Sequence, residues 1–206
     1  MTASRRLRPE FRILFVCTGN LFRSPVAEII SRQLMQEKLG TAAASFTITS
    51  AGTDAVAGRK MDCRSASILA EYGLDRPAGE FRTRKLDAAT VARADLVLTA
   101  ERKHRRAVVM LEPSALATAF CFREFVRLLG EISGPSIPDD PLARAQAAAT
   151  LARQQRGAGR YVPAEIDDIP DPMPHPPHVR QASVKFIAAT ARSFVNFLSS
   201  PHEKLG

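Results

Sequence analysis

The residues best suited to chemistry stand near the N-terminus of this 206-residue chain, in a segment with the spacing C-x5-R. The segment reads Cys17-Thr18-Gly19-Asn20-Leu21-Phe22-Arg23-Ser24. When a strand precedes such a loop and a helix follows it, successive backbone N–H groups point inward and form a nest for an anion. The helix N-terminus adds positive potential, and the planar guanidinium of Arg23 can bind two oxygens of one phosphate. The segment therefore predicts a phosphate-binding loop.

The same loop predicts a nucleophile. A cysteine at a helix N-terminus beside an arginine is favoured as the thiolate, which is the attacking form. We expect Cys17 to be this nucleophile and the hydroxyl of Ser24 to donate a hydrogen bond into the loop. Gly19 and Asn20 are residue types that tolerate the left-handed backbone conformation that a tight wrap demands.

A second segment, from Cys121 to Arg127, has the same spacing. It contains no glycine, and it places Glu124 where an anion would sit. Free cysteines are usually buried, so we interpret Cys121 as a core residue at the end of a strand. Only the first segment is a candidate site.

The flanking sequence contains the elements that must position the first loop. A β-prone apolar run covers residues 11–16, and apolar residues recur at helical spacing from Val26 to Leu39, after the helix-start pair Ser24-Pro25. The pattern continues with strands at 46–49, 95–99 and 116–122, and with helices at 65–72, 88–94, 101–111, 123–129, 142–155 and 178–198. Residues 161–177, rich in Pro and Asp, are predicted to be a loop. Strands that alternate with helices indicate an α/β fold with a parallel sheet.

Composition indicates one globular domain over residues 1–206. Hydrophobic residues make up 45% and charged residues 24%, ordinary values for a soluble protein, and no apolar run approaches the ~20 residues of a membrane helix. Composition shifts at Gly134, where we expect an insertion at about 134–159 that could cover the site. The three cysteines match neither a disulfide framework nor a zinc site, which indicates a reducing cytoplasm and no metal.

The formal net charge of +8 suits phosphorylated partners, and it could also suit nucleic acid. The longest basic cluster is Arg102-Lys103-His104-Arg105-Arg106. It has no interleaved aromatic residues, so we interpret it as a solvated helix face and do not expect nucleic-acid binding.

Taken together, these residues resemble the low-molecular-weight protein tyrosine phosphatase family. That family places a Val-Cys-x-Gly-Asn-x-x-Arg-Ser-Pro loop directly after its first strand, and this chain matches the pattern from Val16 to Pro25. The segment Thr49-Ser50-Ala51-Gly52-Thr53 resembles the end of the family's second strand. The family's serine there helps to hold the loop asparagine, so the resemblance implies that Ser50 supports Asn20.

The resemblance implies a four-stranded parallel sheet with helices on both faces, in three layers. It also implies hydrolysis of phosphomonoesters through a phosphocysteine intermediate on Cys17, without a metal or cofactor. The substrate would be a phosphorylated protein or a small phosphate ester. Its phosphate would be held by Arg23 and by the loop residues Thr18, Gly19, Asn20, Leu21, Phe22 and Ser24.

Asp171-Pro172 resembles the family's general-acid loop, so Asp171 would protonate the leaving oxygen and then activate water. The residues alone leave this role open. Glu165, Asp167, Asp168 and Asp171 lie in one Pro-rich segment, which reads equally well as a solvated acidic loop, and Asp168 is the alternative acid.

Several positions depart from the family pattern. Position 22 is Phe, where many relatives have a second cysteine that can protect the nucleophile in a disulfide. Phe81 replaces a histidine that often precedes x-x-Arg, here Arg84. Aromatic pocket residues are also missing, which leaves Leu21 and Met173 as expected walls and offers a phosphotyrosine ring few stacking partners.

Two other functions use the same loop. An arsenate reductase on this scaffold would need a resolving thiol, and Cys63 and Cys121 do not form a close pair in the sequence. A regulatory module that binds phosphate without turnover would not need a nucleophile, which argues against it.

Overall fold

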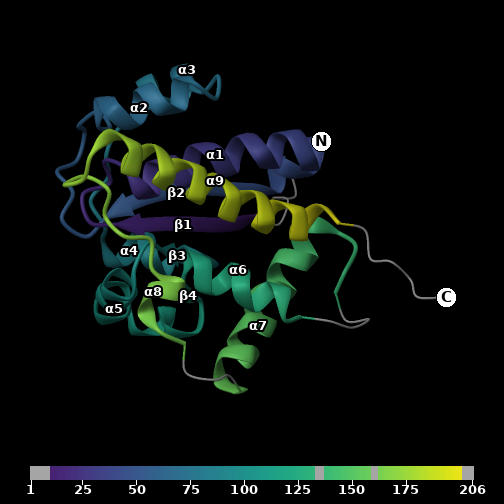
Figure 1. Ribbon diagram of the computed structural model, residues 1–206. Helices are drawn as coiled ribbons and strands as arrows, with labels where there is room; N and C mark the ends of the chain where they lie inside the picture. The colour runs from purple at the N-terminus through teal and green to yellow at the C-terminus, as the bar shows by residue number, and fades with distance from the viewer. Residues whose placement is uncertain (1–9, 133–136, 159–161, 201–206) are drawn as a thin grey trace, which may run out of the picture.

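The computed structural model describes residues 10–132, 137–158 and 162–200, in which a sheet lies between two layers of helices (Figure 1). The strands are β1 (Phe11–Cys17), β2 (Phe46–Gly52), β3 (Leu96–Thr99) and β4 (Ala119–Cys121). They lie in the order β2-β1-β3-β4, and each neighbouring pair is parallel. The expected α/β fold with a four-stranded parallel sheet is confirmed.

The helices follow the strands closely along the chain. They are α1 (Arg23–Leu39), α2 (Cys63–Ala70), α3 (Asp75–Glu80), α4 (Ala88–Ala92), α5 (Arg102–Leu111), α6 (Phe122–Gly130), α7 (Pro141–Ala158), α8 (Ala164–Asp167) and α9 (Pro177–Ser199), with 3₁₀ turns η1 (Gly40–Ser45) and η2 (Pro113–Ala117).

The central strand β1 is buried on both faces, as its nearly continuous apolar sequence predicts. Phe11, Ile13 and Phe15 belong to the larger core, which they share with α1, α6 and α9. Leu14 and Val16 belong to the second core, on the side of α4 and α5. The alternation along one strand therefore joins the two helical layers to the sheet.

The strand order places the candidate loop at a topological switch point. From β1 the chain continues to β2 on one side, and β3 pairs with the other side of β1. In open parallel sheets, ligands bind outside the carboxyl ends of the strands at such a point. Cys17 is the last residue of β1, so the topology positions it there.

Two elements before α6 differ from the prediction. Helix α3 was not predicted, because Pro77 and Gly79 lower its helical propensity. The predicted strand at 116–122 covers only β4, since Pro113 and the Glu112 side chain, which accepts from the Ser114 N–H, begin the turn η2 instead.

The predicted loop at 161–177 contains the single turn α8, and residue 161 lies outside the described part. Two arginines of α6 hold this turn, because Arg123 donates to the Glu165 carbonyl and Arg127 pairs with Asp167. Tertiary contacts therefore stabilise a helical turn that local sequence does not favour.

Helix α7 lies in the region expected to be an insertion. It contacts α6, α9, β1 and η1, and η1 precedes β2 at the amino end of the sheet. Figure 1 accordingly shows α7 away from the heads of the β1 and β2 arrows, which mark the carboxyl ends of these strands. The described part of this region does not cover the candidate site, and its status as an insertion stays a prediction.

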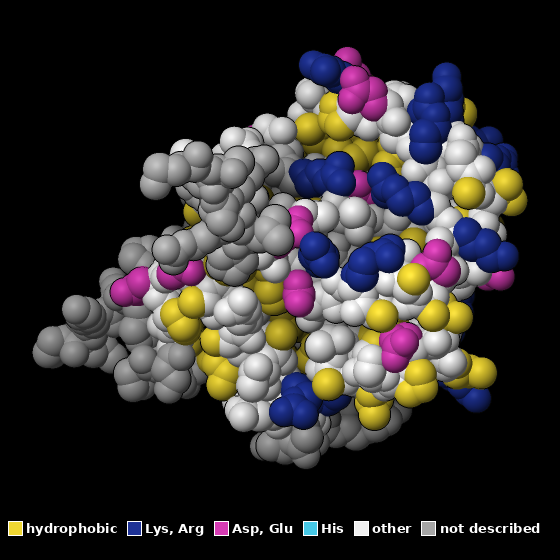
Figure 2. All heavy atoms as spheres, turned by 180° about the vertical axis from the view of Figure 1, so that it is seen from behind, with side chains coloured by type: hydrophobic (Ala, Val, Ile, Leu, Met, Phe, Trp, Pro, Cys, Tyr) yellow, Lys and Arg dark blue, Asp and Glu magenta, His cyan; other side chains and the backbone are white. Residues whose placement is uncertain are grey.

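The basic cluster at 102–106 is not a uniformly solvated helix face, contrary to the prediction. Arg102 donates to the Val162 carbonyl, Arg105 donates to the Ala119 carbonyl, and His104 is buried, whereas Lys103 and Arg106 are exposed. Elsewhere, on the face opposite that of Figure 1, acidic side chains lie among the Lys and Arg side chains (Figure 2). Among the described residues, no helix combines the length and apolarity needed to cross a bilayer.

Candidate active site

Asn20 determines the shape of the loop between β1 and α1. Its φ of 52° lies in the left-handed region that asparagine tolerates. Its buried side chain donates to Ser24 Oγ (2.9 Å) and Ser50 Oγ (2.8 Å), and it accepts from the Arg84 backbone N–H (2.8 Å). The contact expected between Ser50 and Asn20 is thus present. Gly19 does not have a positive φ, so the expected reason for that glycine is wrong.

Gly52, at the end of β2, lets the loop approach the sheet. A Cβ atom at this position would lie 2.4 Å from the Thr18 carbonyl oxygen and 2.7 Å from the Asn20 nitrogen. Both distances are shorter than atoms tolerate, so only glycine allows the loop to rest here. Two further backbone bonds hold the contact, from the Thr53 N–H to the Cys17 carbonyl and from the Asp54 N–H to the Thr18 carbonyl.

Cys17 is buried, and its Sγ atom lies 3.0 Å from Ser24 Oγ. Because Ser24 Oγ accepts a hydrogen bond from Asn20, its own proton is available to donate. The acceptors within reach are Cys17 Sγ and the Ala51 carbonyl at 3.3 Å. When the sulfur is ionised it is the stronger acceptor, so Ser24 can stabilise a Cys17 thiolate directly.

Arg23 is oriented by groups that the sequence did not indicate. Its side chain is 3% exposed, and Nη1 donates to Glu101 Oε2 (2.7 Å) and to the Ile169 carbonyl (3.0 Å). Nη2 lies 3.4 Å from Thr18 Oγ1 and 3.5 Å from Asp171 Oδ2. One edge of the guanidinium is therefore anchored, while Nη2 faces the loop and the expected acid.

Glu101 is ionised in this setting. Burial opposes its ionisation, but hydrogen bonds from Lys103 and Arg23 outweigh burial and hold its pKa below the usual value. From the sequence, Glu101 reads only as the first residue of the predicted helix at 101–111. Its pairing with Arg23 depends on the end of β3 lying beside the loop.

The expected acid, Asp171, is 43% exposed and lies on a loop whose residue Ile169 is bonded to the end of β3 and to Arg23. The Ile169 N–H donates to the Ala100 carbonyl (2.7 Å), and Asp171 Oδ1 accepts from the Met173 N–H (3.3 Å). The loop thus brings a carboxylate from the C-terminal part of the chain next to Arg23.

The other acidic residues of this segment have structural contacts. Asp168 Oδ1 accepts from the Arg102 N–H at 2.8 Å and so caps the first turn of α5. Because this contact occupies the carboxylate, it argues against Asp168 as the alternative acid. Asp167 is buried and pairs with Arg102 and Arg127. The reading of a solvated acidic loop is therefore wrong for these two residues.

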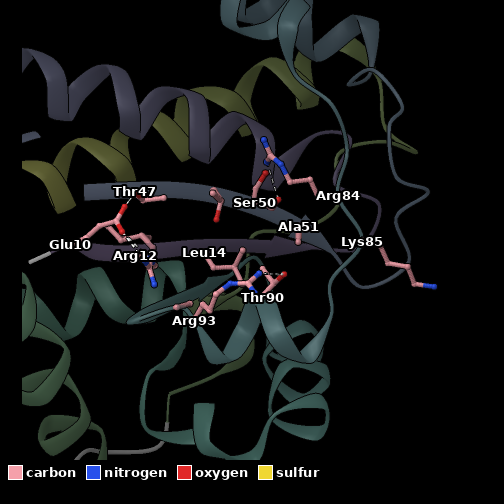
Figure 3. Close-up of a pocket in the computed structure, with 13 residues that line it drawn as sticks. Glu10, Arg12, Leu14, Thr47, Ser50, Ala51, Arg84, Lys85, Thr90 and Arg93 are labelled. Atoms are coloured by element: carbon pink, nitrogen blue, oxygen red, sulfur yellow. Dashed lines mark hydrogen bonds and ion pairs between the residues drawn. The ribbon is translucent and has the colours of Figure 1, made fainter. Parts of the chain in front are cut away.

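A buried carboxylate, Glu28 of α1, lies behind the loop. Glu28 Oε2 accepts from Ser50 Oγ (2.5 Å) and from Arg84 Nη1 (2.9 Å), and Glu28 Oε1 pairs with Arg32 (2.8 Å). Figure 3 shows Arg84 and Ser50 side by side at the end of β2, with the bond from Arg84 to the Ser50 carbonyl drawn as a dashed line. The network joins α1, β2 and the segment before α4, and sequence patterns gave no signal for Glu28.

Figure 3 also shows a groove beside this network, along the sheet face that α4 and α5 leave partly uncovered. Arg12, Thr47 and Arg93 line it, and Lys85 points away from the sheet. The phosphate loop itself does not line the groove, so the groove and the candidate active site are separate.

The side chains around the loop differ in their exposure. Phe22 is buried in the larger core, so it contributes to the loop through its backbone alone. Leu21 and Met173 are half-buried, and Val56, on the loop after β2, is 64% exposed. Phe81, in place of the family's histidine, is buried beneath the Arg84 guanidinium, which lies 5.2 Å above its ring.

The second C-x5-R segment has no anion site. Cys121 is fully buried, and burial raises the pKa of its thiol to about 12. Glu124 accepts from the Cys121 N–H, and Arg127 pairs with Asp167. In the described part of the chain, no cluster of three or more His, Cys, Asp or Glu side chains could hold a metal ion.

His104, in the basic cluster, contacts the loop. Its Nε2 atom lies 2.8 Å from Thr18 Oγ1, and its Nδ1 atom accepts from the Glu101 backbone N–H at 3.1 Å. No sequence pattern indicated this contact, since a histidine within a run of arginines and lysines is typical of a surface residue.

This combination of a parallel α/β sheet, a cysteine at the switch point, a buried arginine and a nearby carboxylate defines a cysteine-dependent phosphatase scaffold. The family model described as low molecular weight phosphotyrosine protein phosphatase matches residues 12–155. The chain belongs to this family.

Individual relatives agree with this result. The chain is 33% identical over 153 residues to EpsP of Ralstonia solanacearum, named as a probable low molecular weight protein-tyrosine-phosphatase. The aligned residues cover 73% of this chain and 93% of the relative. Among solved structures, it is similar to a low molecular weight protein tyrosine phosphatase from T. tengcongensis, with 25% identity, a TM-score of 0.64 and coverage of 91% and 99% of the two chains. The YwlE arginine phosphatase from Geobacillus stearothermophilus shares the fold, with 23% identity, a TM-score of 0.63 and coverage of 90% and 91%.

Proposed function

We propose that this protein hydrolyses phosphomonoesters with Cys17 as nucleophile, Arg23 as the phosphate clamp and Asp171 as the general acid and base. The observation that carries the proposal is that Asp171, from the C-terminal part of the chain, lies beside the loop that holds Cys17 and Arg23. Ser24 Oγ lies 3.0 Å from Cys17 Sγ, and Arg23 Nη2 lies 3.5 Å from Asp171 Oδ2.

In the first step the Cys17 thiolate attacks phosphorus, an S–P bond forms, and the bond from phosphorus to the leaving oxygen breaks. The protonated Asp171 gives its proton to that oxygen. Arg23, anchored by Glu101 through Nη1, binds the equatorial phosphoryl oxygens through the edge that carries Nη2. Negative charge is concentrated on these oxygens in the transition state.

In the second step the Asp171 carboxylate takes a proton from water, the water oxygen attacks phosphorus, and the S–P bond breaks. Inorganic phosphate leaves, and Cys17 returns as a thiolate that Ser24 stabilises by donating its hydroxyl proton. One carboxyl group thus acts as acid and then as base, which a two-step displacement requires.

For the substrate class, we propose a phosphorylated protein or a small phosphate ester, with phosphotyrosine as the first candidate because of the family. The aliphatic residues of the loop and of the segments near it are the half-buried Leu21 and Met173 and the exposed Val56, and these are the candidate walls of the pocket. An aromatic leaving group can pack on such walls but gains no ring stacking.

The test is hydrolysis of p-nitrophenyl phosphate against pH, without metal and with a thiol reductant. We expect turnover by the wild type and none by Cys17→Ser, whereas Cys63→Ser, which changes an exposed cysteine, keeps full activity. Asp171→Asn is expected to be slower by ~10²–10⁴-fold, the range for a lost general acid, and Asp75→Asn is its control.

Two outcomes would contradict the proposal. Arsenate reduction without phosphatase turnover would show a reductase, and a requirement for an added low-molecular-weight thiol would identify the reductant. Phosphate binding without turnover would show a regulatory module.

A further inference from the structure

We propose that His104 is a positioning residue that aims the hydroxyl proton of Thr18 at an oxygen of the phosphoryl group in the loop. The proposal rests on the proposed function and adds a donor from the chain's own side chains to the site. It starts from the 2.8 Å contact between His104 Nε2 and Thr18 Oγ1.

The tautomer of His104 follows from its second contact. Nδ1 accepts the backbone N–H of Glu101, so Nδ1 carries no proton. A neutral imidazole must then carry its proton on Nε2, and this proton can only be donated to Thr18 Oγ1. The ring is 2% exposed, which prevents a water molecule from replacing either partner freely.

The charges around the ring support its neutral form. Burial and the cations Arg23 and Lys103 together lower the pKa of His104 to about 4, against the opposing effect of the carboxylates Glu101 and Asp171. The ring therefore stays neutral near pH 7.

The direction of the Thr18 hydroxyl follows from these contacts. A hydroxyl oxygen has two lone pairs and one proton. His104 occupies one lone pair, and Arg23 Nη2 at 3.4 Å lies toward the other. The hydroxyl proton must then point elsewhere, and within the described residues no acceptor is recorded for it.

The site offers such an acceptor when an anion is bound. Thr18 is half-buried, it belongs to the loop, and its hydroxyl lies beside the Arg23 nitrogen that faces Asp171. A phosphoryl oxygen held by Arg23 Nη2 is therefore within reach of the Thr18 proton. A hydroxyl aimed in advance needs no reorganisation as charge develops, which favours the transition state.

The experiment measures kcat and KM with p-nitrophenyl phosphate, and the Kd of inorganic phosphate by calorimetry, for Thr18→Val, His104→Leu, the double variant and His104→Gln. Thr18→Val keeps the shape but removes the donor, and we expect it to lower kcat roughly 10- to 100-fold, the value of a hydrogen bond to a charged group. His104→Leu should show a smaller loss, because the Thr18 hydroxyl is then free to rotate. His104→Gln retains a donor of similar reach and should recover most of the activity.

The double variant distinguishes positioning from a structural effect. If His104 acts through Thr18, the double variant is no slower than Thr18→Val. The variants Thr41→Val and His178→Leu, at two exposed positions, serve as the controls for the two substitution types. Thermal unfolding of each variant reports on folding, and if His104→Leu does not fold, Thr18→Val and His104→Gln decide.

Three results would overturn the inference. The first is a loss of kcat in the double variant equal to the product of the losses in the two single variants. The second is a Thr18→Val enzyme within twofold of the wild type in kcat and in phosphate Kd. The third is a His104→Gln enzyme as slow as Thr18→Val. A wild type without turnover would refute the proposed function instead, and the phosphate Kd would still report on Thr18 and His104.

Discussion

Replacing Gly52 by alanine tests how closely the catalytic loop must rest on the sheet. The new Cβ atom would lie 2.4 Å from the Thr18 carbonyl oxygen, 2.7 Å from the Asn20 nitrogen and 2.9 Å from the Gly19 carbonyl carbon. All three partners are backbone atoms, so no side chain can rotate away, and the loop itself must move.

The size of the movement follows from these distances. Real Cβ contacts are essentially never shorter than 3.0 Å and are ordinary from 3.4 Å, so the contact at 2.4 Å must lengthen at least to this range. That requires a loop shift of about 0.6–1.0 Å, and misplacement by about 1 Å can cost ~10²-fold in rate. Crowding of this kind also typically destabilises a protein by about 1–3 kcal/mol.

The assay compares kcat/KM for p-nitrophenyl phosphate and urea unfolding for wild type, Gly52→Ala and Gly79→Ala. Gly79 in α3 has open space around it and no positive φ, so it is the matched control. We expect Gly79→Ala to keep full activity and to gain about 0.5–1 kcal/mol from helix propensity. A Gly52→Ala enzyme within threefold of wild type would refute the argument that this contact sets the loop position.

Two further predictions concern titratable groups. Cys121 should resist iodoacetamide in the folded protein up to pH 9, because burial raises the pKa of its thiol to about 12, whereas the exposed Cys63 should react. Mass spectrometry of the two cysteine peptides checks this. Modification of Cys121 as early as Cys63 would contradict its assignment to the core. The second concerns His104, whose pKa of about 4 in the folded state lies below the ordinary 6.5, so the unfolded chain binds the proton first as pH falls. The free energy of unfolding should therefore decrease as the pH falls from 6.5 to 4, and the decrease should be on the order of 3 kcal/mol larger in the wild type than in His104→Leu. Urea unfolding at several pH values measures it, and an equal pH dependence in the two proteins would contradict the prediction.

The sequence by itself determined the features that depend on neighbouring residues. The apolar run of β1, the loop from Cys17 to Ser24 and the periodic pattern of α1 are contiguous, so their order alone predicts a strand, an anion loop and a helix. The alternation of elements predicted the parallel sheet for the same reason. The proposed role of Asp171 was less accessible, because the residues alone did not distinguish it from Asp168, and only the family resemblance favoured it.

Only the tertiary structure decided which distant groups serve the loop. Glu101 on Arg23, Glu28 beneath Ser50, and His104 on Thr18 each join residues that lie far from one another in the sequence. Their types gave no signal, since a glutamate in a helix and a histidine among arginines are ordinary surface residues. What makes them functional is the parallel sheet, which brings the carboxyl ends of β1, β2 and β3 to one edge and buries these polar groups together. A buried polar group must find a partner, and that requirement acts through space and not along the chain.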